Sequence, residues 1–155
     1  MKKLRSSGFS LPELMIVIAI IGIIAALAVP SYQDILERNR LKQAVESLAD
    51  DLKFARTEAI KRSANVTLTL AAGWSYTITS AGNTLKTVQG SQFQGISLDA
   101  ADSVTFSFKR GTASAMGSTL SSAHYDARVI VADVGRVRIC TPDDATGLPS
   151  YPDCD

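Results

Sequence analysis

The hydrophobic pattern of the chain begins with one long apolar segment. Residues 14–29 carry no charge, and a helix over residues 9–29 would be about 30 Å long at ~1.5 Å per residue. That length matches the hydrocarbon core of a bilayer, so we predict a membrane-spanning helix. Lys2, Lys3 and Arg5 precede the segment, and this placement predicts a cytoplasmic N-terminus and an exported C-terminus.

A second helical pattern runs from Ser31 to about Ser63 without Gly or Pro. Charged residues fill most of its faces, and Glu58 with Arg62 makes a favourable i,i+4 pair. We interpret it as a solvated helix packed on a sheet, with a coiled coil as the alternative, and the two helices together would span roughly 80 Å. The apolar positions recur mostly every three or four residues and predict one buried face: Ile35, Leu41, Val45, Leu48, Leu52, Ala55 and Ala59.

From residue 65 the pattern alternates between apolar and polar residues, as in half-buried strands. The segments 66–70 and 74–79 predict a hairpin, and residues 111–123, rich in Gly, Ser, Thr and Ala, predict a loop. The predicted fold is therefore α+β, with an antiparallel sheet covering the apolar face of the helix. The remaining predicted strands are residues 84–88, 96–98, 104–108, 128–132 and 136–139.

Composition adds few constraints. The 155 residues suit one soluble domain with an appendage, and the formal net charge is +1. Without residues 1–8, 13 basic residues would face 15 acidic ones, which indicates no strongly charged partner. His124 is the only histidine, so neither a histidine-rich metal site nor a Ser–His–Asp arrangement is predicted. A Gly-rich phosphate loop is also absent from the sequence, so we expect no enzyme activity, cofactor or metal.

Glu13 is the exceptional residue of the apolar segment, because a carboxylate there is costly in lipid unless it has a partner. A cleaved secretory signal, with Ala26-Leu27-Ala28 as its cleavage site, or a permanent anchor would have no use for it. Cleavage between Gly8 and Phe9 would create an amine about one helical turn away. In an assembly of such helices, Glu13 of one copy would pair with the terminal amine of a neighbour.

The segment Gly8-Phe-Ser-Leu-Pro-Glu-Leu14 resembles the leader junction of type IV pilins and pseudopilins, with Ser10 and Pro12 as departures. The resemblance implies cleavage after Gly8 by a prepilin peptidase and N-methylation of Phe9. It also implies the type IV pilin fold, divided into a leader (1–8), a transmembrane and filament-core helix (9–30) and a periplasmic α+β head (31–155). Such a chain is anchored by one pass in the inner membrane, and an assembly platform there moves it into a surface fibre.

Three stretches of the predicted head look like the FimT/GspH family of minor pilins and pseudopilins: 52–62, 104–111 and 135–138. This resemblance implies a low-abundance subunit near the tip of a pilus, which takes part in pilus assembly or initiation with other major and minor pilins. The alternative that it implies is a minor pseudopilin of a type II secretion system.

Gly135-Arg-Val-Arg138 is the most suggestive surface segment. On a strand, Arg136 and Arg138 would point the same way about 7 Å apart, and guanidinium groups bind phosphate bidentately. The segment resembles a Gly-Arg-x-Arg motif of FimT-like pilins that bind DNA for natural transformation. The resemblance implies Arg136 and Arg138 as principal contacts to double-stranded DNA, without sequence specificity, and Lys109 and Arg110 as secondary ones.

Arg128 would widen this basic surface. A structural alternative exists for the two arginines of the motif, because charges on an edge strand discourage aggregation. In that interpretation they form salt bridges with nearby aspartates: Asp126, Asp133, Asp143 and Asp144.

The two cysteines, Cys140 and Cys154, lie near the end of the chain. Export permits a disulfide, and this one would close a loop of about 15 residues, worth about 3 kcal/mol in the chain-entropy model. A metal site with two cysteine ligands is the rival interpretation, although no paired histidines support it.

Overall fold

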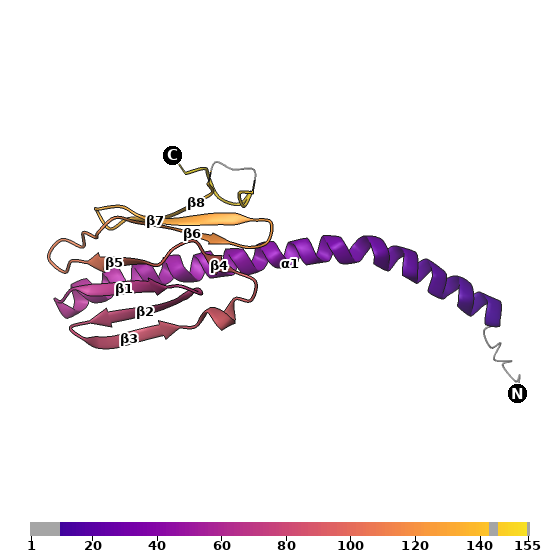
Figure 1. Cartoon of the computed structure of the whole chain (residues 1–155), viewed down its shortest axis with the longest axis horizontal. Helices are drawn as coiled ribbons and strands as arrows, with labels where there is room; N and C mark the ends of the chain where they lie inside the picture. The colour runs from indigo at the N-terminus through magenta and orange to yellow at the C-terminus, as the bar shows by residue number, and fades with distance from the viewer. Residues whose placement is uncertain (1–9, 143–145, 155) are drawn as a thin grey trace, which may run out of the picture. The chain divides into compact units, whose positions relative to one another are not determined.

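The computed structural model describes residues 10–142 and 146–154 (Figure 1). The chain divides into two compact units, residues 1–36 and residues 37–155, and the second is called the head below. The two predicted helices are one continuous element, α1 (Leu11–Arg62), which contributes its first half to the first unit and its second half to the head. The leader residues and Phe9 lie outside the described residues.

The first unit begins with a capped helix end. The Ser10 carbonyl accepts hydrogen bonds from the backbone N–H groups of Glu13 (3.1 Å) and Leu14 (3.2 Å). The Glu13 carboxylate lies 3.5 Å from the backbone nitrogen of Ser10, which donates to it. The Glu13 side chain thus supplies one half of a capping box, and Pro12 fits because the first N–H groups of a helix have no intrahelical partner.

The rest of the first unit is apolar and continuous. Its most apolar window has a mean hydropathy of 2.7 with none of its residues buried, so the helix is long and apolar enough to cross a membrane. Pro30 lies inside α1 and cannot donate the hydrogen bond that its position would normally make to Ala26.

The strands of the head form two antiparallel four-stranded sheets. The first has the order β3-β2-β1-β5, with β1 (Val66–Ala71), β2 (Ser75–Ser80), β3 (Asn83–Val88) and β5 (Asp102–Phe106). The second has the order β4-β6-β7-β8, with β4 (Ser97–Leu98), β6 (Met116–Ser121), β7 (Asp126–Val131) and β8 (Val137–Cys140). A short 3₁₀ helix, η1 (Gly90–Gln92), lies between β3 and β4.

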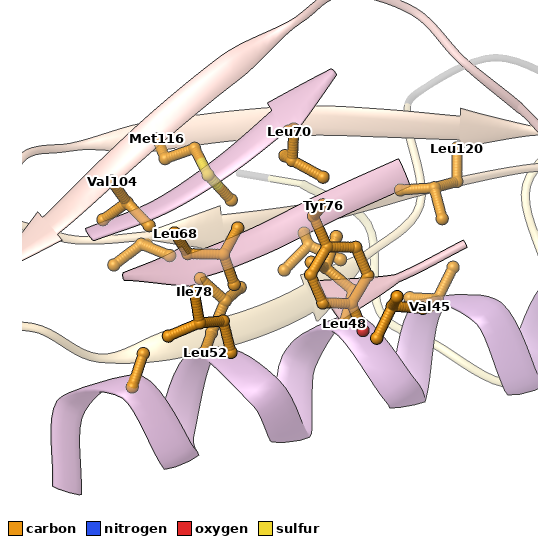
Figure 2. Close-up of a cluster of buried hydrophobic side chains, with 14 of the residues drawn as sticks. Val45, Leu48, Leu52, Leu68, Leu70, Tyr76, Ile78, Val104, Met116 and Leu120 are labelled. Carbon is orange, nitrogen blue, oxygen red and sulfur yellow. The ribbon is translucent and has the colours of Figure 1, made fainter. Parts of the chain in front are cut away.

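The core lies between the helix and the inner faces of the sheets (Figure 2). Alternate residues of β1, β2, β5 and β7 are buried, as the period-two pattern requires. Figure 2 shows the Tyr76 ring lying against the helix near Leu48 and Val45. Every residue of the core cluster belongs to the head, so this unit contains a complete hydrophobic core of its own. The helix residues of the core cluster are Leu41, Ala44, Val45, Leu48, Leu52, Ala55 and Ala59.

The α+β architecture of a long helix on antiparallel strands is confirmed, and four local predictions need correction. Residues 111–123 are not all loop, because β6 occupies six of them. The strands form two sheets instead of one. Trp74 does not start a strand but lies in the preceding turn at φ 58°, where it is buried. Ile35, predicted on the buried face, is 51% exposed.

A buried polar network joins α1 to the first sheet. Asp51 is 6% exposed and accepts hydrogen bonds from the Tyr76 hydroxyl (2.7 Å) and from Lys86 Nζ (2.6 Å). Burial and, to a lesser degree, the Asp51 carboxylate raise the pKa of Tyr76 well above its usual range, although Ser47 lowers it. The hydroxyl is therefore a neutral donor, and the network connects the helix to both β2 and β3.

A second polar contact joins α1 to the turn between β6 and β7. The Glu37 carboxylate accepts from the Ser122 hydroxyl (2.7 Å), the His124 backbone N–H (2.7 Å) and the His124 ring nitrogen Nδ1 (2.9 Å). Burial alone would raise the pKa of Glu37, but these hydrogen bonds and the charge of His124 together lower it to about 2. The turn is thus held to the helix by an ionised carboxylate.

Candidate functional site

Arg138 lies on the outer face of the second sheet, in its edge strand β8, and Arg136 immediately precedes that strand. In the β7–β8 register Ile130 pairs with Arg138 and Val131 pairs with Val137. Val131 is buried, so the neighbouring pair points away from the core, and Arg138 is exposed. Arg136, two residues earlier, precedes the first residue of β8, and it too is exposed.

Two glycines bring the two basic segments of the sequence together. Gly111 (φ 63°) and Gly135 (φ 75°) adopt backbone conformations that side chains disfavour. A Cβ atom on Gly135 would overlap the carbonyl oxygen of Gly111, so the two turns are in direct backbone contact. The Arg56 side chain of α1 lies beside both glycines and donates to the Val134 carbonyl at 3.3 Å. The glycine of the Gly-Arg-x-Arg motif is therefore required by packing.

Lys109 and Arg110 precede Gly111, and Arg136 follows Gly135, so the glycine contact places these three cations on adjacent turns. All three side chains are exposed. Both turns lie at the end of the head where α1 terminates (Figure 1). We call this region, which comprises residues 56–62, 107–111 and 132–136, the basic end.

Arg128 lies outside the segments of the basic end, and its register partner Cys140 is two residues from Arg138. Its guanidinium lies over Gly117 of β6, where a Cβ atom would come within 2.9 Å of it. It lines a shallow hollow of about 550 Å³, together with the carboxylates Asp102 and Asp133. Carboxylates beside a guanidinium compete with phosphate, so this hollow is a poor anion site. The other lining residues are Ala115, Met116, Ile130, Val131, Ala132 and Cys154.

Two of the four aspartates proposed as salt-bridge partners lie within the described residues. Asp126 accepts from the Thr146 hydroxyl at 2.8 Å, and Asp133 lines the hollow. Asp143 and Asp144 lie outside the described residues.

The basic residues of the site differ in whether they already interact with other groups of the chain. Within residues 10–142 and 146–154, Arg110 and Arg136 enter no ion pair, whereas Arg138 has an interaction within the chain. We therefore expect Arg136 to be the more available of the two motif arginines.

The C-terminal segment is fastened beside β8. Cys140 and Cys154 form a disulfide, with their Cα atoms 5.0 Å apart. The Thr141 backbone N–H donates to the Pro152 carbonyl, and the Cys154 N–H donates to the Thr141 carbonyl, each at 2.8 Å. No group of three or more His, Cys, Asp or Glu side chains in the described parts of the chain is placed to hold a metal.

Arg56 and Phe108 are the residues of this region that the sequence did not single out. In the sequence, Arg56 is one of many charged residues of a helix predicted to be solvated. Its contact with both turns depends on the close approach of Gly111 and Gly135, which are distant in the sequence. Phe108 continues the alternation of Val104 and Phe106, which predicts burial, but β5 ends at Phe106 and Phe108 is 36% exposed.

Family models match both halves of the chain. The model described as Type II transport protein GspH matches residues 44–135. This range includes α1 from residue 44 to its end, Gly111 and Gly135, and every strand except β8. The chain belongs to the GspH family. The prokaryotic N-terminal methylation motif matches residues 3–29, which include Gly8, Phe9 and Glu13. This GspH-family chain is therefore a member of the type IV pilin and pseudopilin group.

Curated relatives match less than half of the chain. The type IV major fimbrial protein FimA of Dichelobacter nodosus is 50% identical over 64 residues, 41% of this chain and 38% of that protein. FimA of D. nodosus strain VCS1703A is 57% identical over 54 residues, 35% of this chain and 32% of that protein. The GspH-family chain thus spans less than two fifths of the length of these relatives.

The solved structure of the Pseudomonas aeruginosa type IV minor pilin FimU has the same fold. It superposes with a TM-score of 0.57 at 20% sequence identity, covering 70% of this chain and 96% of FimU. At this identity the likeness establishes the fold of the GspH-family chain and nothing finer.

Proposed function

We propose that the chain is a minor type IV pilin that takes part in starting or capping a pilus, near its tip. The main supporting observation is that a methylation motif, an apolar helix and a GspH-type head occur in the same chain, in that order. The apolar half of α1 would supply contacts to other major and minor pilins. Glu13 would pair with the Phe9 amine of a neighbouring subunit, after a prepilin peptidase has cut behind Gly8.

This proposal places the chain first in the inner membrane, as a single-pass protein with a periplasmic head, and then in the fibre. The assembly platform would be its inner-membrane partner. Intact-mass spectrometry of the chain purified from its host tests the processing step. We expect the mass of residues 9–155 with one added methyl group on Phe9, whereas a mature start after Ala28 would refute the pilin assignment.

The alternative role is that of a minor pseudopilin in type II secretion, which the description of the family model favours. Deletion of the chain distinguishes the two roles. Loss of surface pili with normal protein secretion supports the pilus, whereas loss of secretion with normal pili supports the pseudopilus.

A second candidate function is binding of double-stranded DNA for natural transformation. It is favoured by the backbone contact of Gly111 with Gly135, which puts Lys109, Arg110 and Arg136 on adjacent turns. Arg138 continues this surface along β8, whereas Arg128 faces the hollow and is expected to contribute least. Such binding would rest on phosphate contacts, so it would be insensitive to sequence and would weaken steeply with salt.

Titration of the head with duplex DNA at low and moderate salt tests this candidate. Each lost phosphate contact should lower the salt slope by about 1, so Arg136→Ala together with Arg138→Ala should lower it by about 2. Arg40→Ala, an exposed arginine of α1 outside the basic end, is the matched control. Unchanged affinity in the double variant would remove the motif from any DNA-binding role.

A further inference from the structure

Three apolar side chains are exposed at the basic end. Ile60 is 55% exposed, Phe108 36% and Val134 63%. The tip of Ile60 lies beside Gly111, Phe108 is in the same turn as Gly111, and Val134 immediately precedes Gly135. Because Gly111 and Gly135 are in contact, the three side chains belong to adjacent segments, which Arg56 joins.

Cations outnumber carboxylates around these apolar side chains. The only carboxylates in the three segments are Glu58 and Asp133. Glu58 is buried, and the Arg62 guanidinium, with help from Lys61, holds its pKa below the usual range against the effect of burial. The region therefore presents a positive surface whose members are Arg56, Lys61, Arg62, Lys109, Arg110 and Arg136.

Duplex DNA would account for the cations and leave the apolar residues unexplained, because a phosphate backbone offers no apolar volume to three separate side chains. A folded protein partner would need a larger apolar contact than three protruding side chains provide. Apolar groups that protrude from turns, with cations beside them, match the chemistry of an anionic lipid surface. There the apolar groups enter the acyl boundary and the cations face the headgroup phosphates.

We propose that the basic end binds an anionic phospholipid surface. Phe108, Val134 and Ile60 enter the membrane interface, while Lys109, Arg110 and Arg136 lie against the headgroups. This role is independent of DNA binding, since it depends on the apolar side chains as well as on the charges. Each cation near such a surface strengthens partitioning about fivefold, and loss of a buried aromatic or aliphatic side chain weakens it about tenfold or more.

Vesicle co-sedimentation of the head tests the proposal. The head is used because it holds a complete core and lacks the apolar half of α1, which would insert by itself. Vesicles of equal parts phosphatidylglycerol and phosphatidylcholine should bind the head, and pure phosphatidylcholine should not. Phe108→Ser with Val134→Ser should lower partitioning at least about tenfold. Far-UV circular dichroism should stay unchanged, because both positions are exposed.

Matched variants separate this mechanism from others. Phe54→Ser removes an aromatic side chain that is 40% exposed outside this apolar trio and should bind as the wild type does. Lys109→Gln with Arg110→Gln should weaken binding about 25-fold, the product of two fivefold effects. Titration with duplex DNA should be unaffected by Phe108→Ser with Val134→Ser, so failure of the lipid proposal and failure of DNA binding can be told apart.

Several results would overturn the proposal. These are absence of binding to the anionic vesicles, equal binding to both vesicle types, and full binding by Phe108→Ser with Val134→Ser. An equal loss in Phe54→Ser would also contradict it. If inorganic phosphate at the same phosphate concentration displaced the head from vesicles completely, the site would be a simple anion site and not a membrane surface.

Discussion

Gly135 has neighbours that leave no room for a side chain. Alanine there would overlap the Gly111 carbonyl, approach Arg56 Nε within 3.1 Å and keep an unfavourable φ of 75°. We expect Gly135→Ala to lower the free energy of unfolding by about 2–4 kcal/mol, measured by urea denaturation of the head. It should also weaken any ligand binding at the basic end, because the two basic turns must move apart.

Gly82→Ala is the matched control for that substitution. Gly82 has a similar φ of 82° and nothing within 4 Å of a Cβ atom. Only the conformational cost remains, about 1 kcal/mol. Equal losses in the two variants would contradict the packing role assigned to Gly135.

Glu37 gives the head a stability contribution that depends on pH. Its pKa is about 2 in the folded chain against an ordinary value of 4.5, so the contribution is complete above pH 4.5 and lost as pH falls toward 2. Glu37→Gln should therefore cost about 1–2 kcal/mol at neutral pH, and this difference should shrink through that window. Thermal unfolding at a series of pH values measures it.

The control for that series is Glu46→Gln, which alters another glutamate of α1, one that accepts a hydrogen bond from the Tyr151 hydroxyl at 3.0 Å. A cost of Glu37→Gln that stays constant between neutral pH and pH 2 would show that the carboxylate charge is not what holds the turn at Ser122 and His124.

At the scale of elements, the contact between α1 and the first sheet depends on Asp51. Asp51→Ala leaves the buried Tyr76 hydroxyl with only its longer contact to Ser47 Oγ at 3.5 Å and leaves Lys86 without its partner, so we expect a loss of about 2–3 kcal/mol. Lys86→Met should cost less, about 1 kcal/mol, because the Lys86 side chain is 45% exposed. Urea denaturation measures both losses, as shifts of the unfolding midpoint at an unchanged m-value.

Asp50→Ala changes the preceding residue and serves as the control. The Asp50 side chain is 73% exposed and paired with Lys53 at 2.9 Å on the helix surface, so its removal should change stability by less than about 0.5 kcal/mol. A loss as large as that of Asp51→Ala would mean that general helix charge, and not the buried network, decides stability.

The strands that the sequence predicts are those whose alternation is strong. The segments near β1, β2 and β5 alternate regularly, and they were located to within a few residues. The sequence does not predict β6, because its alternation of apolar and polar residues is weak. Ser118 is a polar residue on the buried side, and Gly117 is small on the outer side, where the Arg128 guanidinium covers it. The division into two sheets depends on pairings between distant segments, which local patterns do not contain.

At the scale of the whole molecule, sequence motifs identify individual candidate residues but do not predict which of them lie together in the fold. The sequence predicts a strand from Arg136 to Ile139, and β8 runs from Val137 to Cys140, so Arg138 lies in the strand and Arg136 immediately precedes it. The grouping of Lys109 and Arg110 with Arg136 depends on the contact of Gly111 with Gly135, and the separation of Arg128 depends on Gly117. Both arise from backbone packing between segments more than ten residues apart, which no motif encodes.

Glu13 can act on its own helix or on a neighbouring molecule, and the two roles predict different outcomes. As a helix cap it reaches back to the Ser10 N–H, a role that glutamine also fills. As an assembly contact it supplies a negative charge for the amine of another copy, which glutamine does not. We expect Glu13→Gln to lower the amount of the chain in sheared pili about 100-fold or more, since an unpaired buried charge costs ~3 kcal/mol.

Intact mass should still show cleavage and methylation of the Glu13→Gln chain, and membrane fractions should hold it at wild-type amounts. Normal incorporation of Glu13→Gln together with failure of Glu13→Ala would identify the cap as the important role. Failure of both variants, with processing intact, would locate the defect in contacts between subunits. The substitution thus tests whether the single carboxylate of the apolar segment acts within the helix or between molecules.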